Sequence, residues 1–182
     1  SDSLQRAATL ASLGIALPEK LAIFCPGAEY GPAKRWPAKH FAAVANVLAD
    51  QGYAVWLLGS QKDRAIADQI INRTDLTRQP HNLCGATTLT QAIDLLAAAE
   101  FVVCNDSGLM HLAAALDRPL VALYGSSSPG FTPPLSVRAK VISLHLDCSP
   151  CFQRSCPLGH LDCLNKLDPQ RVLDACLSKA LA

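Results

Sequence analysis

The sequence has little of what marks several common classes of protein. Aromatic residues make up 5% and charged residues 17% of its 182 residues, the formal net charge is +1, and Met110 is the single methionine. Such a neutral balance does not favour a nucleic-acid partner, because nucleic-acid-binding proteins usually carry a basic excess. Pro, Gly or charged residues interrupt every apolar stretch before it reaches the roughly 20 residues of a membrane-spanning helix. We therefore expect a soluble globular chain, processed or excised from a longer one.

Three motifs of common enzymes are also missing. The chain contains neither the G-x-G-x-x-G fingerprint of dinucleotide-binding folds nor the G-x-x-x-x-G-K-[ST] phosphate loop. It also lacks the G-x-S-x-G turn that presents the nucleophile of many hydrolases. A dehydrogenase, an ATPase and a serine hydrolase are therefore disfavoured.

Short apolar runs alternate with amphipathic stretches along the whole chain. The runs that we expect to be strands span residues 21–25, 53–58, 81–84, 101–104, 120–124 and 140–144. Between them, apolar residues recur at helical spacing. This alternation is typical of an α/β protein whose parallel sheet is covered by helices on both faces. We predict a doubly wound, Rossmann-like sheet of six strands in the order 3-2-1-4-5-6.

The helices at the two ends of the chain bear on its domain organisation. A helix from about Ser3 to Leu13 is stopped by Gly14, and we expect residues 1–20 to be a linker or a helix from an interdomain region. Residues 21–182 then form a single domain, ending in a helix from about Pro169 to Ala180.

Two further residues predict where internal helices begin. Pro37 suits the first turn of the helix after the first strand, because proline's missing N–H is not needed there. Thr88 suits the N-cap position of the helix before the fourth strand.

In the predicted sheet the first and fourth strands lie side by side, at the point where the winding reverses and ligands bind. The segment from Asn105 to His111 directly follows the fourth strand and opens a helix, whose free N–H groups and positive end suit a phosphate. The alternative is a simple helix cap followed by an interior histidine. The position at the crevice favours a phosphate site with the candidate residues Asp106, Ser107, Gly108, Leu109 and His111.

The loop after the first strand, Pro26 to Pro37, carries two adjacent cations near its end. A cationic tip opposite an anion site suits a diphosphate. Lys34 is the better candidate because its ammonium is a compact point charge, whereas Arg35 could equally pair with a carboxylate. The alternative for both is a solvated surface pair.

Two other loops border the same crevice. Asp63 follows the second strand, where doubly wound nucleotide-binding folds place an acid on the ribose hydroxyls. It could equally be an acidic residue that stabilises the first turn of a helix. The loop from Gly85 to Thr88 follows the third strand and could present backbone groups to a base.

Seven of the eight cysteines fall into two groups, and the eighth, Cys176, stands further on at a helical apolar spacing. Three of them close apolar strand-like runs, which favours a reducing cytoplasm over a disulfide framework: Cys25, Cys84 and Cys104. Four cluster in one segment: Cys148, Cys151, Cys156 and Cys163. Thiols suit a structural zinc, but the spacing is irregular. Zinc, buried thiols that pin a loop, and a redox-labile pair therefore remain open.

Four segments together resemble glycosyltransferase family 9: Cys25 to Pro37, Asn105 to His111, Tyr124 to Pro129 and Cys148 to Cys163. The resemblance extends from about Leu21 onward. It implies a GT-B glycosyltransferase, in which the N-terminal half binds the acceptor and the C-terminal half binds the nucleotide-sugar. The sequence resembles the second half alone, so we expect it to bind nucleotide without transferring sugar by itself.

The resemblance also implies the substrates. The donor is ADP-L-glycero-D-manno-heptose and the acceptor is the inner core of lipopolysaccharide, at the cytoplasmic face of the inner membrane, where the enzyme is peripheral. Transfer inverts the anomeric centre without an obligatory metal, so no cofactor and no metal are assigned. The alternatives are a stand-alone nucleotide-binding module, a transferase for another nucleotide-sugar, and a zinc-stabilised interaction domain.

Roles for individual residues follow from the same resemblance. Lys34 and Asp106 are the catalytic candidates, with Lys34 on the phosphate and sugar and Asp106 on the heptose hydroxyls. Ser107, Gly108 and Leu109 form the backbone site for the diphosphate, supported by His111. The ribose and adenine are expected at Asp63, Thr87 and Thr88. The general base lies in the N-terminal half.

Overall fold

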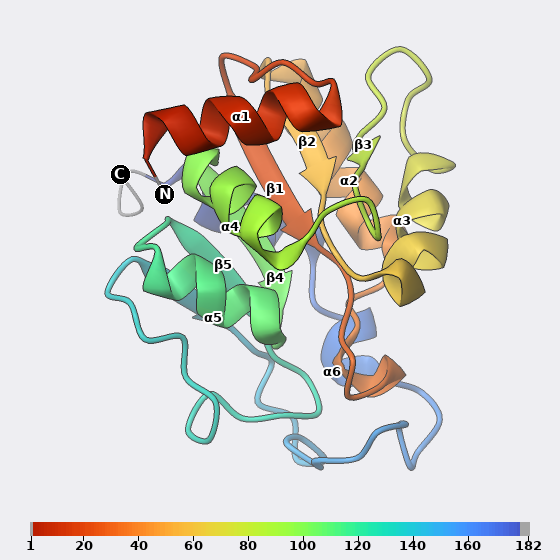
Figure 1. Cartoon of the computed structure of the whole chain (residues 1–182). Coiled ribbons are helices and arrows are strands. Elements are labelled where there is room, and N and C mark those ends of the chain that lie inside the picture. Colours follow the sequence, from red (N-terminus) through yellow and green to blue (C-terminus); the bar gives the residue numbers. More distant parts are fainter. Residues whose placement is uncertain (1, 179–182) are drawn as a thin grey trace.

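The computed structural model describes residues 2–178 and contains one sheet of six parallel strands (Figure 1). The strands are β1 (Leu21–Cys25), β2 (Ala54–Leu57), β3 (His81–Asn82), β4 (Phe101–Asn105), β5 (Leu120–Leu123) and β6 (Ala139–Ile142). Their order is β3-β2-β1-β4-β5-β6. This order and the parallel direction confirm the predicted doubly wound α/β sheet.

Helices cover both faces of the sheet. They are α1 (Ser3–Leu13), α2 (Ala38–Asp50), α3 (Arg64–Ile71), α4 (Leu89–Ala98), α5 (Gly108–Ala115), α6 (Asp162–Asn165) and α7 (Pro169–Leu177), with short 3-10 helices η1 (Pro32–Lys34) and η2 (Gln61–Asp63). Figure 1 shows α1, α4 and α5 in front of the sheet. None of the helices in the described part of the chain is long and apolar enough to cross a membrane.

The core forms two layers, one on each side of the sheet. In β1, Ala22 and Phe24 face the layer formed with α2, α3 and α7, whereas Ile23 and Cys25 face the layer formed with α4 and α5. Both faces of this strand are buried, which is why its sequence is apolar throughout rather than alternating. Two buried layers hold β1 and β4 rigidly at the centre of the sheet, and the candidate site lies at their carboxyl ends.

Helix α1 has the predicted bounds and packs against α4. Gly14 ends it in a left-handed conformation, with φ of 65°. The Thr9 hydroxyl donates a buried hydrogen bond of 2.6 Å to the Asp94 carboxylate of α4. These contacts place the helix in the front layer, and the boundary between residues 1–20 and the domain that follows stays a prediction.

Some predicted element ends differ from the structure. Pro37 stands at the N-cap position rather than inside the first turn, and its carbonyl accepts the N–H groups of His40 and Phe41. Strand β3 is shorter than its apolar run because the Asn82 side chain accepts the N–H of Cys84 and turns the backbone. Helix α7 ends at Leu177, and the predicted last residues 179 and 180 lie outside the described residues.

Candidate functional site

One buried amide joins the two central strands at the site. Asn105, the last residue of β4, is 0% exposed. Its Nδ2 donates to the carbonyl of Pro26 over 2.8 Å, and its Oδ1 accepts the backbone N–H of Trp36 over 3.1 Å. The loop between these two partners carries Lys34. A single side chain thus fixes both ends of that loop against the strand that precedes Asp106.

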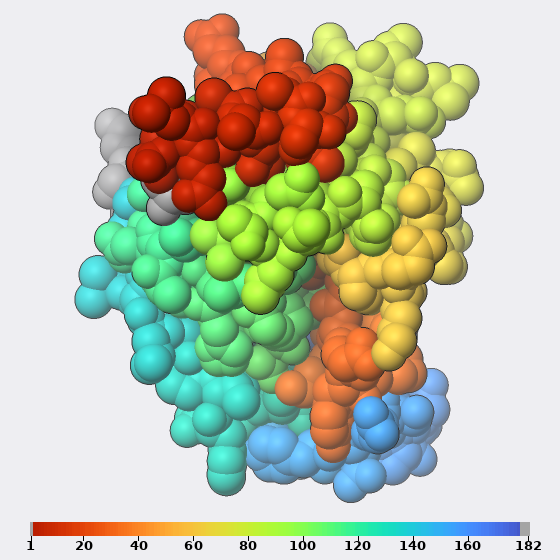
Figure 2. All heavy atoms as spheres, in the orientation of Figure 1, coloured from red at the N-terminus to blue at the C-terminus, as the bar shows by residue number. Residues whose placement is uncertain are grey.

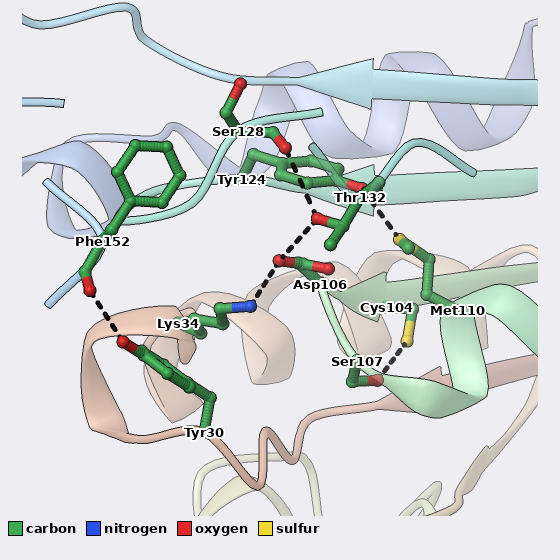
Figure 3. Close-up of polar contacts among 10 residues, drawn as sticks. All are labelled: Tyr30, Lys34, Cys104, Asp106, Ser107, Met110, Tyr124, Ser128, Thr132 and Phe152. Carbon is green, nitrogen blue, oxygen red and sulfur yellow. Dashed lines mark hydrogen bonds and ion pairs between the residues drawn. The ribbon is translucent and has the colours of Figure 1, made fainter. Parts of the chain in front are cut away.

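Lys34 and Asp106 form an ion pair at this junction (Figure 3). The ammonium lies 2.6 Å from Oδ2 of Asp106, whose side chain is almost fully buried. Thr132 donates its hydroxyl to the same oxygen over 3.2 Å, and the Tyr30 ring lies 5.0 Å from the ammonium. A carboxylate with so little access to water is held by its partners, because an uncompensated buried charge is costly. The structure therefore brings together the two catalytic candidates from the sequence.

Ser107, the residue after Asp106, lines a cavity of about 380 Å³, which is within the range of small-molecule sites. It is lined by residues after β1, β2, β3 and β4, together with α4 and α5. The predicted binding residues along its wall are Asp63, Thr87, Thr88, Ser107, Gly108 and Leu109. Figure 2 shows the hollow between green α4 and α5 on one side and the orange and yellow segments on the other.

Backbone amides at the start of α5 form one wall of this larger cavity. Ser107 occupies the N-cap position without capping through its side chain, and its hydroxyl lies 3.3 Å from the Cys104 sulfur. The first-turn N–H groups, at Gly108 and Leu109, have no intrahelical acceptor in any α-helix. A Cβ at Gly108 would meet no atom within 4 Å, so the space in front of this turn is open. Such a turn suits an anion.

Asp63 has a structural role that the sequence left as an alternative. Its Oδ2 accepts the backbone N–H of Ser60 over 2.9 Å and the Ser60 hydroxyl over 2.8 Å, which makes it the acid of a capping box at η2. Arg35 lies 3.9 Å from its other oxygen. Asp63 lines the larger cavity as well, and contact with a ribose stays a prediction.

Thr88 and His111 have different surroundings. Thr88 caps α4 as predicted, in a capping box with Gln91, and its exposed side chain also lines the larger cavity. His111 is exposed on α5 and does not line the larger cavity. Its predicted support of a bound anion is therefore not visible in the geometry and stays a prediction.

A second, smaller cavity of about 250 Å³ includes Lys34 in its lining. It is lined by Tyr30, Lys34, Ser127, Ser128, Phe131, Thr132 and Phe152. Sequence reasoning assigned no role to any of these except Lys34. The signal that could have found some of them is the Gly-Ser-Ser-Ser-Pro segment directly after β5, at the same edge of the sheet as the other site loops.

Tyr124 anchors the segment that carries Thr132. Its ring is fully buried, and its hydroxyl donates to the carbonyl of Thr132 and contacts the Met110 sulfur. Burial and the nearby Asp106 carboxylate raise the pKa of Tyr124 well above its usual value. The phenol thus stays protonated and remains a hydrogen-bond donor at any physiological pH.

Known proteins resemble this chain in both sequence and fold. Residues 1–162 match the family model described as glycosyltransferase family 9 (heptosyltransferase). The chain belongs to glycosyltransferase family 9. Among family 9 proteins, lipopolysaccharide heptosyltransferase 2 of Escherichia coli K12 is 51% identical over 153 residues, covering 83% of this chain and 44% of that protein. Lipooligosaccharide heptosyltransferase 2 of Haemophilus influenzae is 54% identical over 123 residues, covering 66% of this chain and 36% of that protein.

Solved family 9 structures share the fold. The E. coli structure of ADP-heptose LPS heptosyltransferase II matches with a TM-score of 0.86 at 44% identity, covering 96% of this chain and 50% of that one. The E. coli heptosyltransferase WaaC with ADP matches with a TM-score of 0.65 at 27% identity, covering 92% and 46%. These matches confirm the predicted GT-B type of α/β fold. The chain spans about half the length, or less, of the relatives it matches.

Proposed function

We propose that this chain is the nucleotide-sugar-binding part of an inverting glycosyltransferase that transfers heptose from ADP-heptose to the inner core of lipopolysaccharide. The observation that carries the proposal is the Lys34–Asp106 pair: Lys34 lines the smaller cavity, and Ser107, the residue after Asp106, lines the larger one. The larger cavity has open amides at a helix start, as a diphosphate requires. The names of the relatives supply the sugar and the acceptor.

The larger cavity suits the ADP part of the donor. The diphosphate would lie against the amides of Ser107, Gly108 and Leu109, and the nucleoside would extend toward Asp63, Thr87 and Thr88. The sugar would then lie near Asp106. The next residue, Ser107, lines the larger cavity, and the ion-pair partner of Asp106, Lys34, lines the smaller one.

Catalysis follows from where negative charge develops. As the bond between the sugar and the diphosphate breaks, the leaving diphosphate gains charge. Amide donors and an ammonium that are already in place bind this transition state better than the ground state. In this proposal Lys34 exchanges part of its contact with Asp106 for the diphosphate, which leaves carboxylate lone pairs to accept hydrogen bonds from sugar hydroxyls.

The acceptor and the cellular location belong to the same proposal. The acceptor would be the inner core of lipopolysaccharide at the cytoplasmic face of the inner membrane, where the enzyme acts as a peripheral protein. The base that deprotonates the acceptor hydroxyl would come from the other half of the transferase. Neither the amide site nor the ion pair requires a bound metal to neutralise the leaving group.

Titration calorimetry with ADP, UDP and GDP tests the proposal on this chain. We expect ADP to bind at least about tenfold more tightly than UDP or GDP, equivalent to about 1.4 kcal/mol. Lys20→Ala, at the opposite end of β1 from the site, is the matched control for loss of a lysine and should leave ADP affinity unchanged. A chain that binds no nucleotide, or prefers UDP, would contradict the proposal.

A further inference from the structure

Four cysteines that the proposed function does not use lie around one small cavity. Between β6 and α6 the chain runs through residues 143–161 without a helix or strand. Long segments of this kind inside a domain usually have a function or a dedicated means of fixation. Cys148, Cys151, Cys156 and Cys163 line a single cavity here, beside Ala33 of the Lys34 loop, and all four are free thiols.

Backbone N–H groups surround the sulfur of Cys156. The backbone N–H of Leu161 donates to its sulfur over 3.4 Å, and the N–H groups of Leu158, Gly159 and His160 also interact with it. Backbone N–H groups that converge on one sulfur are typical of metal-bound cysteine, whose charge they stabilise.

Cys163 is the one buried residue of the four, whereas Cys148 is exposed and Cys151 and Cys156 are partly exposed. If these cysteines lose their protons, the resulting thiolates around one partly buried space repel one another. A cation among them would reverse this effect, because it stabilises every thiolate that surrounds it.

Two of the other polar side chains at this cavity already have partners. Nδ1 of His160 accepts the backbone N–H of Asp162 over 2.9 Å. The Asp162 carboxylate pairs with Lys166 over 2.7 Å. The four sulfurs are the most numerous metal-ligating atoms around this cavity, and a set of four sulfurs selects thiophilic ions.

We propose that Cys148, Cys151, Cys156 and Cys163 bind one thiophilic metal ion, zinc or iron, as a structural tetrathiolate site. Among residues 2–178 no group of three ligating side chains already stands in position to hold a metal, so binding must close the site. The thiol side chains rotate to other staggered rotamers and release their protons to water. Metal–sulfur bonds of about 2.3 Å then form for a tetrahedral zinc.

The site would secure one wall of the Lys34 loop. Between Cys151 and Cys156, the carbonyl of Phe152 accepts the Tyr30 hydroxyl over 2.7 Å, and the carbonyl of Arg154 accepts the N–H of Ala33 over 3.1 Å. Both partners belong to the loop that carries Lys34. A metal that joins the two cysteines would hold these carbonyls in place where no sheet or helix does.

Metal analysis of the reduced chain, purified without chelator, tests the site without any nucleotide. We expect about one zinc or iron per chain, and elemental analysis decides which of the two is present. Cys148→Ser removes an exposed ligand and should remove most of the metal while the circular dichroism stays native. Cys176→Ala, at a buried cysteine of α7, is the matched control and should retain the metal.

Cobalt(II) added to the metal-free, reduced chain gives an independent readout. We expect the visible absorption of tetrahedral cobalt with thiolate ligands, saturating at about one equivalent, and absent in Cys148→Ser. A chain without metal that also gives no cobalt spectrum would overturn the proposal. So would a Cys148→Ser variant that keeps full metal, or a native chain whose mass shows disulfides among these cysteines.

Discussion

The larger and the smaller cavity near the Lys34–Asp106 pair are built in different ways. The larger cavity is formed by residues at the ends of strands and the starts of helices, whose positions are set by the parallel sheet and its two buried layers. The smaller cavity is formed mainly by residues 127–132 and Phe152, which lie in segments without helix or strand. Regular secondary structure fixes the larger cavity, whereas the smaller cavity depends on individual hydrogen bonds.

This difference matches two chemical tasks. A diphosphate is recognised by fixed amides, and these must not move when charge develops. Sugars present many hydroxyls in varied arrangements, and loop side chains such as Ser128 and Thr132 can be varied without disturbing the sheet. We call the surroundings of the larger cavity the strand side and those of the smaller cavity the loop side. Substitutions on the strand side should therefore affect stability and nucleotide binding, and substitutions on the loop side should affect binding of the sugar.

The largest effect is expected at Asn105. Asn105→Ala leaves the buried N–H of Trp36 and the carbonyl of Pro26 without their partner, so the free energy of unfolding should fall by about 3 kcal/mol. Urea denaturation measures it. Asn46→Ala removes a single, more exposed contact with the N–H of Asp75 and should cost less than about 1 kcal/mol. Equal losses in the two variants would show that Asn105 does not clamp the loop.

Two glycines on the strand side should respond in opposite ways. A Cβ at Gly27 would lie 2.2 Å from Cγ of Asp63, so Gly27→Ala should lower the free energy of unfolding by about 2 kcal/mol. A Cβ at Gly108 meets open space, so Gly108→Ala should leave stability within about 0.5 kcal/mol.

Gly108→Ala should instead weaken ADP binding about tenfold, because the new methyl group fills the space in front of the amides. Thermal denaturation and ADP titration of the same two variants separate these effects. If Gly108→Ala binds ADP with native affinity, the diphosphate lies elsewhere.

A smaller effect is expected on the loop side, at Thr132. Thr132→Val removes the hydroxyl that holds Asp106 and should weaken the binding of ADP-heptose by about 1 kcal/mol while ADP affinity is unchanged. Thr132→Ser keeps the donor and should bind both ligands like the native chain. If ADP and ADP-heptose lose the same affinity in Thr132→Val, the loop side does not serve the sugar.

The smallest effect is a difference in reactivity between a loop thiol, Cys156, and a buried thiol beside the sheet, Cys84. In the metal-free, reduced chain, Cys156 should be alkylated at a lower pH than an ordinary cysteine, because backbone N–H groups lower its pKa. Burial raises the pKa of Cys84 to about 12, so Cys84 should stay unmodified below that pH while the chain is folded. Mass spectrometry after a short iodoacetamide pulse at increasing pH measures the order. Modification of Cys84 first would contradict the assigned surroundings.

The strand side could be predicted from the sequence for a physical reason. A strand buried on both faces leaves a continuous apolar run, and the run 21–25 gave β1 with its correct bounds. The order of six such runs in a doubly wound sheet then placed the end of β1 beside the end of β4. That adjacency is what brings Lys34 to Asp106.

The loop side could not be predicted in the same way. Thr132 reaches Asp106 because the Tyr124 hydroxyl binds the carbonyl of Thr132, a contact that no local pattern encodes. Phe152 reaches the site through the Tyr30 hydroxyl, 122 positions away in the sequence. Asp63 shows a further limit, because one residue type at one position fits both a capping acid and a ribose ligand.

The most direct test of the account is ADP titration of Lys34→Ala beside Lys20→Ala. The Lys34 ammonium pairs with Asp106, which directly precedes the N-cap residue of α5, so its loss should weaken ADP binding about tenfold or more. Lys20→Ala should bind ADP as the native chain does. Equal ADP affinity in both variants, with both folded by circular dichroism, would contradict the claim that Lys34 and these amides hold one diphosphate.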